Sequence, residues 1–193
     1  MQSHPHQVIG YHSCDKDIGL RIISGEIELK ESKNAWDWLG HGTYFWEDNP
    51  IRALEYAEEV RDRKQFNSGK IKIPFVIGAI IELGNCLNLL APSGTEVLRT
   101  THESLKSLVK VAGQKMPVNK KDNRALDCSV IRLAANTNKY DTVRTAFDEG
   151  EKIYAGTNFT ARHHMQICVI NQDCIKGFFL PRPLKTFNPH CFL

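Results

Sequence analysis

The N-terminal part of the chain is patterned as a strand, a helix and a second strand. Residues 8–12 are mostly apolar and predict a short strand, and the apolar positions within 18–23 predict a short helix that ends near Gly25. A turn-like stretch follows over 33–40, and residues 43–46 then have strand propensity. We therefore expect a strand on each side of a short helix.

An amphipathic helix and a long buried strand are predicted next. Pro50 follows two polar residues, which is typical of a helix start with proline in the first turn. Beyond it, Ile51, Leu54 and Ala57 share one helical face, and mostly charged residues occupy the other, which predicts a surface helix. Residues 71–83 form a long apolar run, which indicates a largely buried strand.

The middle of the chain is helical and its last third returns to strand patterning. Apolar spacing over 95–138 predicts two helices around a polar, basic connector at 115–123, and residues 141–147 fit one more short helix. Strands are then predicted over 153–154, 166–170 and 175–180. No repeat is visible, so we expect one α+β domain that spans residues 1–193, with helices inserted between strands.

Composition excludes some classes of protein without naming a function. Charged residues make up 24% and aromatic residues 9%, which argues against a disordered or coiled-coil chain, and the net charge of +3 does not demand nucleic acid. The longest nearly apolar run, 73–83, is too short to span a bilayer, so no membrane contact is expected. Residues 1–7 lack the features of a secretory signal, and we expect a cytoplasmic protein.

The six cysteines indicate reduced thiols and no metal site. None of them forms a C-x-x-C pair, so the spacing of a zinc ribbon or finger is missing. His163, His164 and Cys168 are the nearest approach to a ligand set, but on a strand they do not all share a face. We expect no metal.

Two short segments carry the least ordinary residues of the chain. Tyr11-His12-Ser13 lies at the end of the first predicted strand, and residues 40–46, Gly-His-Gly-Thr-Tyr-Phe-Trp, follow about thirty positions later. Glycines beside a Tyr-Phe pair let the backbone approach a flat ligand on which a tyrosine ring can stack. The two segments are the first candidates for a binding site.

Over residues 8–57 the chain resembles the ADP-ribosyltransferases of the diphtheria-toxin and poly(ADP-ribose) polymerase type. Their first motif is a strand that ends in His and a small residue, here His12 and Ser13, followed by a helix and a Gly-Leu-x stretch, here at 19–21. Their second motif, Gly-x-Gly-x-Tyr-Phe, matches residues 40–45. The resemblance implies a split antiparallel β-sheet core with inserted helices and, as substrate, NAD.

The resemblance also implies roles for individual residues in binding NAD. His12 is expected to hydrogen-bond a ribose hydroxyl, the backbone at Ser13 to hold the nicotinamide carboxamide, and Tyr44 to stack on the nicotinamide ring, with Gly42 letting the backbone come close. Tyr56 is expected to form a second wall of the nicotinamide slot.

Two positions depart from the family pattern. Arg52 stands where many members place a serine that bonds the carboxamide, and it can instead pair with the pyrophosphate. The third motif is a glutamate at the start of a late strand, and its best match is Gln166, which makes this chain a His-Tyr-Gln variant. An amide binds ribose but does not stabilise positive charge as a carboxylate does, which favours transfer of a single ADP-ribose.

Other side chains are candidates for roles that the matched motifs do not fill, namely a catalytic carboxylate, a base for the acceptor and contacts to the acceptor. Glu149 and Glu151, just before Tyr154, are the carboxylates expected to move into the site if one is required, and His163 and His164 are candidates to deprotonate an acceptor. The basic connector can meet phosphates of an RNA or DNA acceptor or can simply be solvated, and the indoles can form a lid or can pack under a loop. These residues are Lys115, Lys120, Lys121 and Arg124, and Trp36, Trp38 and Trp46.

The sequence therefore predicts a mono-ADP-ribosyltransferase that cleaves NAD and modifies a macromolecular acceptor, protein or nucleic acid. By resemblance it is an intracellular toxin of a toxin–antitoxin or phage-defence system, with an antitoxin protein as a possible partner. A non-catalytic module that binds NAD or ADP-ribose is the alternative that the missing glutamate supports. A transferase that acts on an RNA 2′-phosphate is a third, although no clear basic set stands at matching positions.

Overall fold

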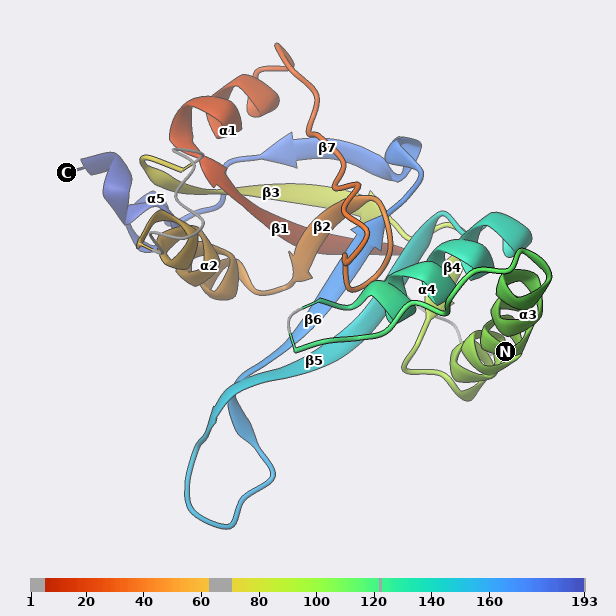
Figure 1. Cartoon of the computed structure of the whole chain (residues 1–193). Coiled ribbons are helices and arrows are strands. Elements are labelled where there is room, and N and C mark those ends of the chain that lie inside the picture. The colour runs from red at the N-terminus through yellow and green to blue at the C-terminus, as the bar shows by residue number, and fades with distance from the viewer. Residues whose placement is uncertain (1–5, 63–70, 122, 193) are drawn as a thin grey trace.

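The computed structural model describes residues 6–62, 71–121 and 123–192 as a mixed α/β structure built on one sheet (Figure 1). The seven strands have the order β4-β5-β6-β2-β1-β3-β7, and neighbours run antiparallel except for the parallel pair β4 and β5. The strands are β1 (Gln7–Asp15), β2 (Thr43–Glu47), β3 (Pro74–Glu82), β4 (Cys86–Asn88), β5 (Thr142–Lys152), β6 (Thr160–Val169) and β7 (Ile175–Phe179).

The described residues form five helices. They are α1 (Lys16–Ile23), α2 (Pro50–Asp62), α3 (Pro92–Val111), α4 (Ala125–Asn138) and α5 (Leu184–Phe187), and two 3₁₀ turns, η1 (Gln172–Cys174) and η2 (Pro189–Phe192), accompany them. Of the helices, α1, α2 and α4 pack on the faces of the sheet, whereas α3 packs mainly on α4 and α5 on α2. None of these helices is long and apolar enough to cross a membrane.

Two of the helices flank the centre of one face. Leu54 of α2 packs in a buried cluster with Trp46 of β2, whereas Ile131 of α4 belongs to a second cluster against which Tyr44 packs. Because side chains alternate along a strand, Tyr44 and Trp46 point to the same face of the sheet. The face that carries these two aromatic residues therefore lies between α2 and α4.

The opposite face is closed by α1 and by the loop that follows it. Phe45 of β2 points to this side and is fully buried with Ile81 and Ile167, and Ile22 of α1 packs against Phe75. The buried run of β3 is apolar because the strand lies inside the sheet, with β1 and β7 as its neighbours.

The structure corrects several expectations. Residues 141–147 were predicted as a helix but lie mostly in β5, because pairing with β6 over nearly the whole strand outweighs their weak local helical pattern. Residues 153–154 are not a strand: they form the exposed end of the β5–β6 hairpin. Ile51 is exposed, and the charged Arg52 is buried in its place. The sheet is also not purely antiparallel.

Candidate functional site

The sheet has a seam where β1 and β2 separate. The two strands pair only at Gly10–Glu47 and Tyr11–Trp46, whereas β1 pairs with β3 along its whole length. The next residue after the last pair, His12, turns its Nδ1 to the backbone carbonyl of Tyr44 at 2.8 Å. The His12 side chain therefore hydrogen-bonds a backbone carbonyl of β2 at the point where the pairing of β1 with β2 ends.

Strand alternation fixes which way the backbone of Ser13 points. At the two ends of the β1–β3 ladder, Lys16 N–H donates to the Ile73 carbonyl and Leu83 N–H donates to the His6 carbonyl. Residues 6 and 16 thus bond toward β3, and because the direction alternates along a strand, all even-numbered residues of β1 direct their N–H and C=O toward β3. Odd-numbered residues face β2, as Ile9 does when its carbonyl accepts from Asp48 N–H.

Ser13 is thus left with a donor and an acceptor that face the seam. A continued β1–β2 ladder would pair Ser13 with Tyr44, but their register has no such pair, and the carbonyl of Tyr44 accepts from His12 instead. One N–H and one C=O side by side are the complement of a primary carboxamide.

His12 is held neutral in one tautomer. Burial lowers the pKa of His12, and its hydrogen bond to the Tyr44 carbonyl opposes this in part. Because that carbonyl can only accept, Nδ1 carries the proton and Nε2 is left as an acceptor. The ring also packs against Phe45, with centroids 5.7 Å apart. A neutral, fixed imidazole of this kind accepts a hydrogen bond from a hydroxyl group.

The Tyr44 hydroxyl is hydrogen-bonded to the backbone of the loop just before β2. It donates to the Gly40 carbonyl at 2.6 Å and accepts from Leu39 N–H at 2.9 Å. Burial raises the pKa of Tyr44, so the phenol stays protonated and the two bonds persist. The ring is half-buried beside Cys168 and α4, and this orientation is therefore set by the fold.

Gln166 lies inside β6, although a strand start was predicted for it. It pairs with Trp46 on one side and Thr145 on the other, so its side chain shares the face of Tyr44 and Trp46. The strand begins earlier, at Thr160, because the polar residues before Gln166 pair with the projecting half of β5.

His164 fixes the amide of Gln166. Its Nδ1 lies 3.0 Å from the carbonyl of Arg162 and therefore carries the proton, which makes Nε2 an acceptor for the Gln166 amide nitrogen at 3.1 Å. Burial, as the largest cause, lowers the pKa of His164 and keeps it neutral. The carbonyl oxygen of Gln166 is left to accept from a ligand. With both ring nitrogens bonded, His164 is no base for an acceptor.

Arg52 forms an ion-pair cluster instead of facing solvent. Its guanidinium lies 3.1 Å from Glu149 of β5 and 3.4 Å from Glu59, and its carbon lies 6.0 Å from the centre of the Trp46 ring. The Arg52 side chain is only 7% exposed. Within the described ranges, neither its Nε nor the indole N–H of Trp46 has a hydrogen-bond partner. Both donors are buried, so a ligand on the surface of the site does not reach them.

Tyr56 lies beside Trp46. The rings of Tyr56 and Trp46 are 5.1 Å apart at 47°, and Tyr56 is partly exposed. The two rings form an aromatic pair at the base of α2, and the role of Tyr56 as a second wall stays a prediction.

Gly42 has a packing reason to be glycine. A Cβ at this position would lie 2.4 Å from the carbonyl oxygen of Val169 and 2.7 Å from the sulfur of Cys168, with φ at +154°. Gly42 therefore allows the close approach of β6 at the point where its pairing with β2 starts, and the approach of a ligand to Gly42 stays a prediction.

The remaining candidates lie further from the seam. Glu149 shares the face of Gln166 but lies four register positions along the hairpin, roughly 13 Å away. Glu151 is exposed beyond it, and His163 points to the other face beside Asp148, at 3.3 Å. Among the residues that the structure describes, no cluster of His, Cys, Asp or Glu is arranged to hold a metal.

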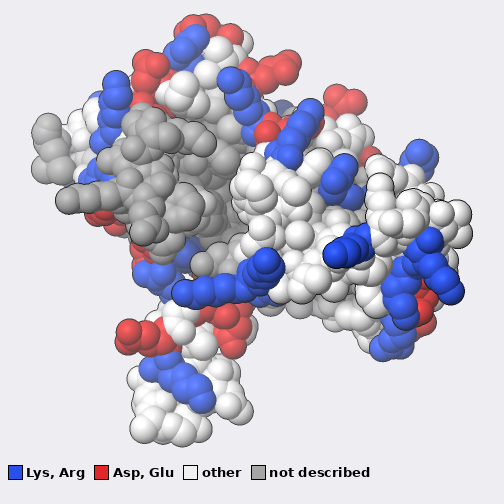
Figure 2. Space-filling model, in the orientation of Figure 1, with Lys and Arg blue, Asp and Glu red and all other residues white. Residues whose placement is uncertain are grey.

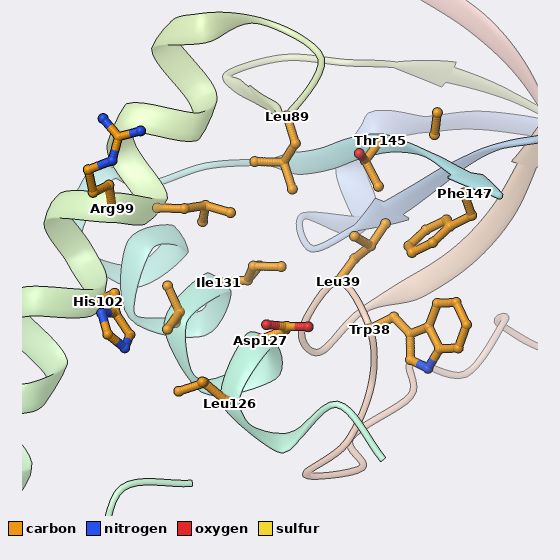
Figure 3. Close-up of a pocket in the computed structure, with 13 residues that line it drawn as sticks. Trp38, Leu39, Leu89, Arg99, His102, Leu126, Asp127, Ile131, Thr145 and Phe147 are labelled. Atoms are coloured by element: carbon orange, nitrogen blue, oxygen red, sulfur yellow. The ribbon is translucent and has the colours of Figure 1, made fainter. Parts of the chain in front are cut away.

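A hollow of about 490 Å³ lies beside this site, between α3, α4 and β5 (Figure 3). Its floor is apolar, with Leu39 and Ile131 near the centre, and Trp38 and Phe147 form one wall. The Phe147 ring lies 6.0 Å from that of His164, so the hollow adjoins the residues that hold Gln166. Sequence reasoning missed Phe147 and the link from His164 to Gln166, although the alternation of 164 and 166 on one strand face was a signal for the link.

Comparison of the chain with protein-family models, with curated proteins and with solved structures gave no match. The function has to be argued from the site alone.

Proposed function

We propose that the protein is a mono-ADP-ribosyltransferase that cleaves NAD and transfers ADP-ribose to an acceptor. The observation that carries this proposal is the seam between β1 and β2, where the backbone N–H and C=O of Ser13 point toward β2 and have no ladder partner among the described residues. Nicotinamide has a carboxamide with complementary groups, and an aromatic ring that can lie against Tyr44 or the Trp46–Tyr56 pair.

Two fixed acceptors lie on either side of the seam, His12 on the face of Phe45 and Gln166 on the face of Tyr44, so a ribose that meets both has to lie within the seam itself. Nε2 of His12 and the amide oxygen of Gln166 can each accept a hydrogen bond from a ribose hydroxyl. Both are held in place by a second bond, His12 to the Tyr44 carbonyl and Gln166 to His164. Such preorganised contacts hold the sugar as the glycosidic bond lengthens.

In the reaction, the bond between C1′ of the ribose and the nicotinamide nitrogen breaks, and its electron pair stays on the nicotinamide. C1′ becomes oxocarbenium-like, and a lone pair of the acceptor forms the new bond while the acceptor loses its proton to solvent. Gln166 offers only the dipole of its amide oxygen to the positive charge, and the carboxylate of Glu149 is held by its ion pair with Arg52. The site therefore fits an acceptor that is nucleophilic without strong activation.

Release of nicotinamide from NAD by the full-length chain is the direct test. We expect release by the wild type, and a loss of about 100-fold or more in the His12→Ala variant, because a preorganised contact to the reacting sugar is gone. His6→Ala is the matched control, since His6 is exposed at the start of β1, and its rate should be unchanged. No release by the wild type contradicts an enzyme, and equal rates of release by wild type and His12→Ala mean that His12 is not part of the catalytic site.

The amide at position 166 favours one alternative, a non-catalytic module that binds NAD or ADP-ribose. Gln166→Glu separates the two readings, because a carboxylate stabilises an oxocarbenium ion better than an amide does. An enzyme should keep or increase its rate of nicotinamide release in this variant, whereas Gln166→Ala should lower it. A binding module gives saturable NAD binding by calorimetry and no nicotinamide release in any of these variants.

A further inference from the structure

Positive charge is concentrated in one segment of the chain. Residues 99–132 contain eight Lys or Arg and three Asp or Glu, a formal charge of +5, whereas the whole chain carries +3. Figure 2 shows Lys and Arg spread over the part of the surface formed by α3 and α4, with few acidic groups between them. The segment forms two sides of the hollow beside the candidate active site.

The hollow lies beneath this charged surface and has flat aromatic walls, and its own charged lining residues are Arg99 and Asp127, the latter 3.3 Å from Arg124. Trp38 and Phe147 lie 4.9 Å apart at 55°, and the guanidinium of Arg124 lies 4.8 Å from the centre of the Trp38 ring. Arg99 and His102 project from α3 on the opposite side (Figure 3). The Nε of Arg124 is buried and has no hydrogen-bond partner among the described residues.

The dimensions of the hollow favour one unstacked base over a duplex. A volume of about 490 Å³ is in the range of sites for small molecules, and a base inside a double helix cannot enter such a site unless it leaves its stack. Aromatic walls stack on any base, and Lys or Arg at the rim pair with the phosphates on either side of it. An acidic peptide would use the charges but leave the Trp38–Phe147 wall without a matching partner.

We infer that this surface binds single-stranded nucleic acid, with one base in the hollow between Trp38, Phe147 and α3, and that this strand is the acceptor. The role as acceptor rests on the proposed transferase activity, whereas the binding does not. The Phe147 ring lies 6.0 Å from that of His164, which holds Gln166, so a base in the hollow is next to the place where C1′ of the ribose would lie.

Fluorescence anisotropy with the full-length chain and no NAD tests the binding. The probes are a 12-nucleotide DNA, the RNA of the same sequence, the matching duplex, an abasic strand of the same length and a polyglutamate of equal charge. We expect a DNA or RNA single strand to bind about tenfold or more tightly than the duplex, the abasic strand and polyglutamate, with an affinity that falls as salt rises. Which of the two single strands binds better identifies the chemistry of the acceptor.

Variants separate stacking from charge. Trp38→Ala should lower the affinity for the single strand to that for the abasic strand, and Trp38→Phe should keep part of the difference. Lys115→Glu with Lys120→Glu should weaken all nucleic acids alike and reduce the salt dependence. The matched control is Lys30→Glu with Lys185→Glu, which changes the same charge on exposed residues outside the segment and should leave binding unchanged.

Several outcomes overturn the inference. They are no binding of the single strand at low salt, equal binding of the abasic strand, tighter binding of polyglutamate, and an unchanged affinity in both Trp38 variants. The binding assay contains no NAD. If the single strand does not bind but nicotinamide is released from NAD at the normal rate, the nucleic-acid inference is wrong and the transferase proposal is unaffected. Binding without any nicotinamide release refutes the transferase and supports only the nucleic-acid surface.

Discussion

At the scale of the residue, the site depends on groups whose hydrogen bonds are already used on one side. His12, Tyr44 and Gln166 each bond to the protein through one polar atom, and in His12 and Gln166 a second atom remains for a ligand. Side chains held in this way lose little freedom when a substrate binds. Two predictions belong to this scale.

The close approach of β2 and β6 makes Gly42 sensitive to a single methyl group. Gly42→Ala places a Cβ against the backbone of Val169 and should lower the free energy of unfolding by roughly 1–3 kcal/mol, measured by urea denaturation. Gly177→Ala in β7 is the control, since nothing lies within 4 Å of its Cβ, and alanine there should be neutral or stabilise by about 0.5–1 kcal/mol. An unaffected Gly42→Ala variant would show that the strands can move apart at this point.

The two buried imidazoles should make folding sensitive to acid. Burial lowers the pKa of both His12 and His164 from the ordinary value of 6.5. As the pH falls below 6.5, these two histidines are therefore protonated in the unfolded chain before they are protonated in the folded chain. Their contribution to stability is complete above pH 6.5 and is lost as the pH falls through and below that value. Urea unfolding at pH 7.5, 6.5 and 5.5 should show the decrease.

Variants show whether these two rings cause the effect. His12→Asn and His164→Gln should each make the decrease in unfolding free energy shallower, because each removes one group that titrates in the unfolded chain. If the slope is the same in wild type and in both variants, other groups are responsible.

At the scale of the element, the side chain of Asn188 takes the place of a strand residue beside β3, at the point where the pairing of β3 with β7 ends. Even-numbered residues of β3 face β7, but the register with β7 stops at Gly78. Beyond it, Val76 would have an unpaired N–H and C=O. The amide of Asn188 accepts from Val76 N–H at 2.7 Å and donates to its carbonyl at 3.0 Å, and Asn188 is fully buried. The C-terminal segment thereby completes the edge of β3.

Removing this amide should destabilise the protein without touching the site. Asn188→Ala leaves two buried backbone groups unpaired and should lower the free energy of unfolding by about 2–4 kcal/mol. Asn138→Ala, at the exposed end of α4, is the control and should change it by less than about 0.5 kcal/mol. Nicotinamide release at a temperature where Asn188→Ala remains folded should be unchanged, and a selective loss of this activity would link the C-terminus to the site.

At the scale of the whole molecule, the sheet consists of two parts that meet at the β1–β2 seam. One part is β4-β5-β6-β2 and the other is β1-β3-β7, and β1 and β2 are joined by two register pairs, by the bond from Asp48 N–H to the Ile9 carbonyl and by the bond from His12 to Tyr44. The helix α2 spans the seam through the packing of Leu54 with Trp46 and Val76. The helix α2 therefore holds the two parts together, while the backbone groups of Ser13 have no ladder partner on β2 in the described register.

Hydrogen exchange of single amides, followed by NMR, can detect the seam. The N–H of Ser13 faces the gap and should exchange faster than that of Cys14, which bonds toward β3. Nicotinamide should slow the exchange of Ser13 and leave Cys14 unchanged. Slow exchange at both residues without a ligand would mean that the ladder continues past Tyr11 in solution.

The sequence by itself determined the local elements. Apolar spacing and helix signals placed α1, α2, α3 and α4, and the Pro at position 50 located the start of α2. The motifs around His12 and Tyr44 could be found because their residues are close in sequence, and the two segments do meet at the seam. Period and propensity act over a few residues, which is why they are readable from the chain.

The tertiary structure decided what depends on residues that are distant in sequence. Residues 142–152 are a strand because β6 pairs with them, and Arg52 is buried because Glu149, almost a hundred residues later, lies beside it. The exposed groups of Ser13 exist only because β1 keeps its ladder with β3 and loses it with β2. Non-local pairing energies have no signature in a local window, so the candidate residues came from the sequence and their chemistry from the fold.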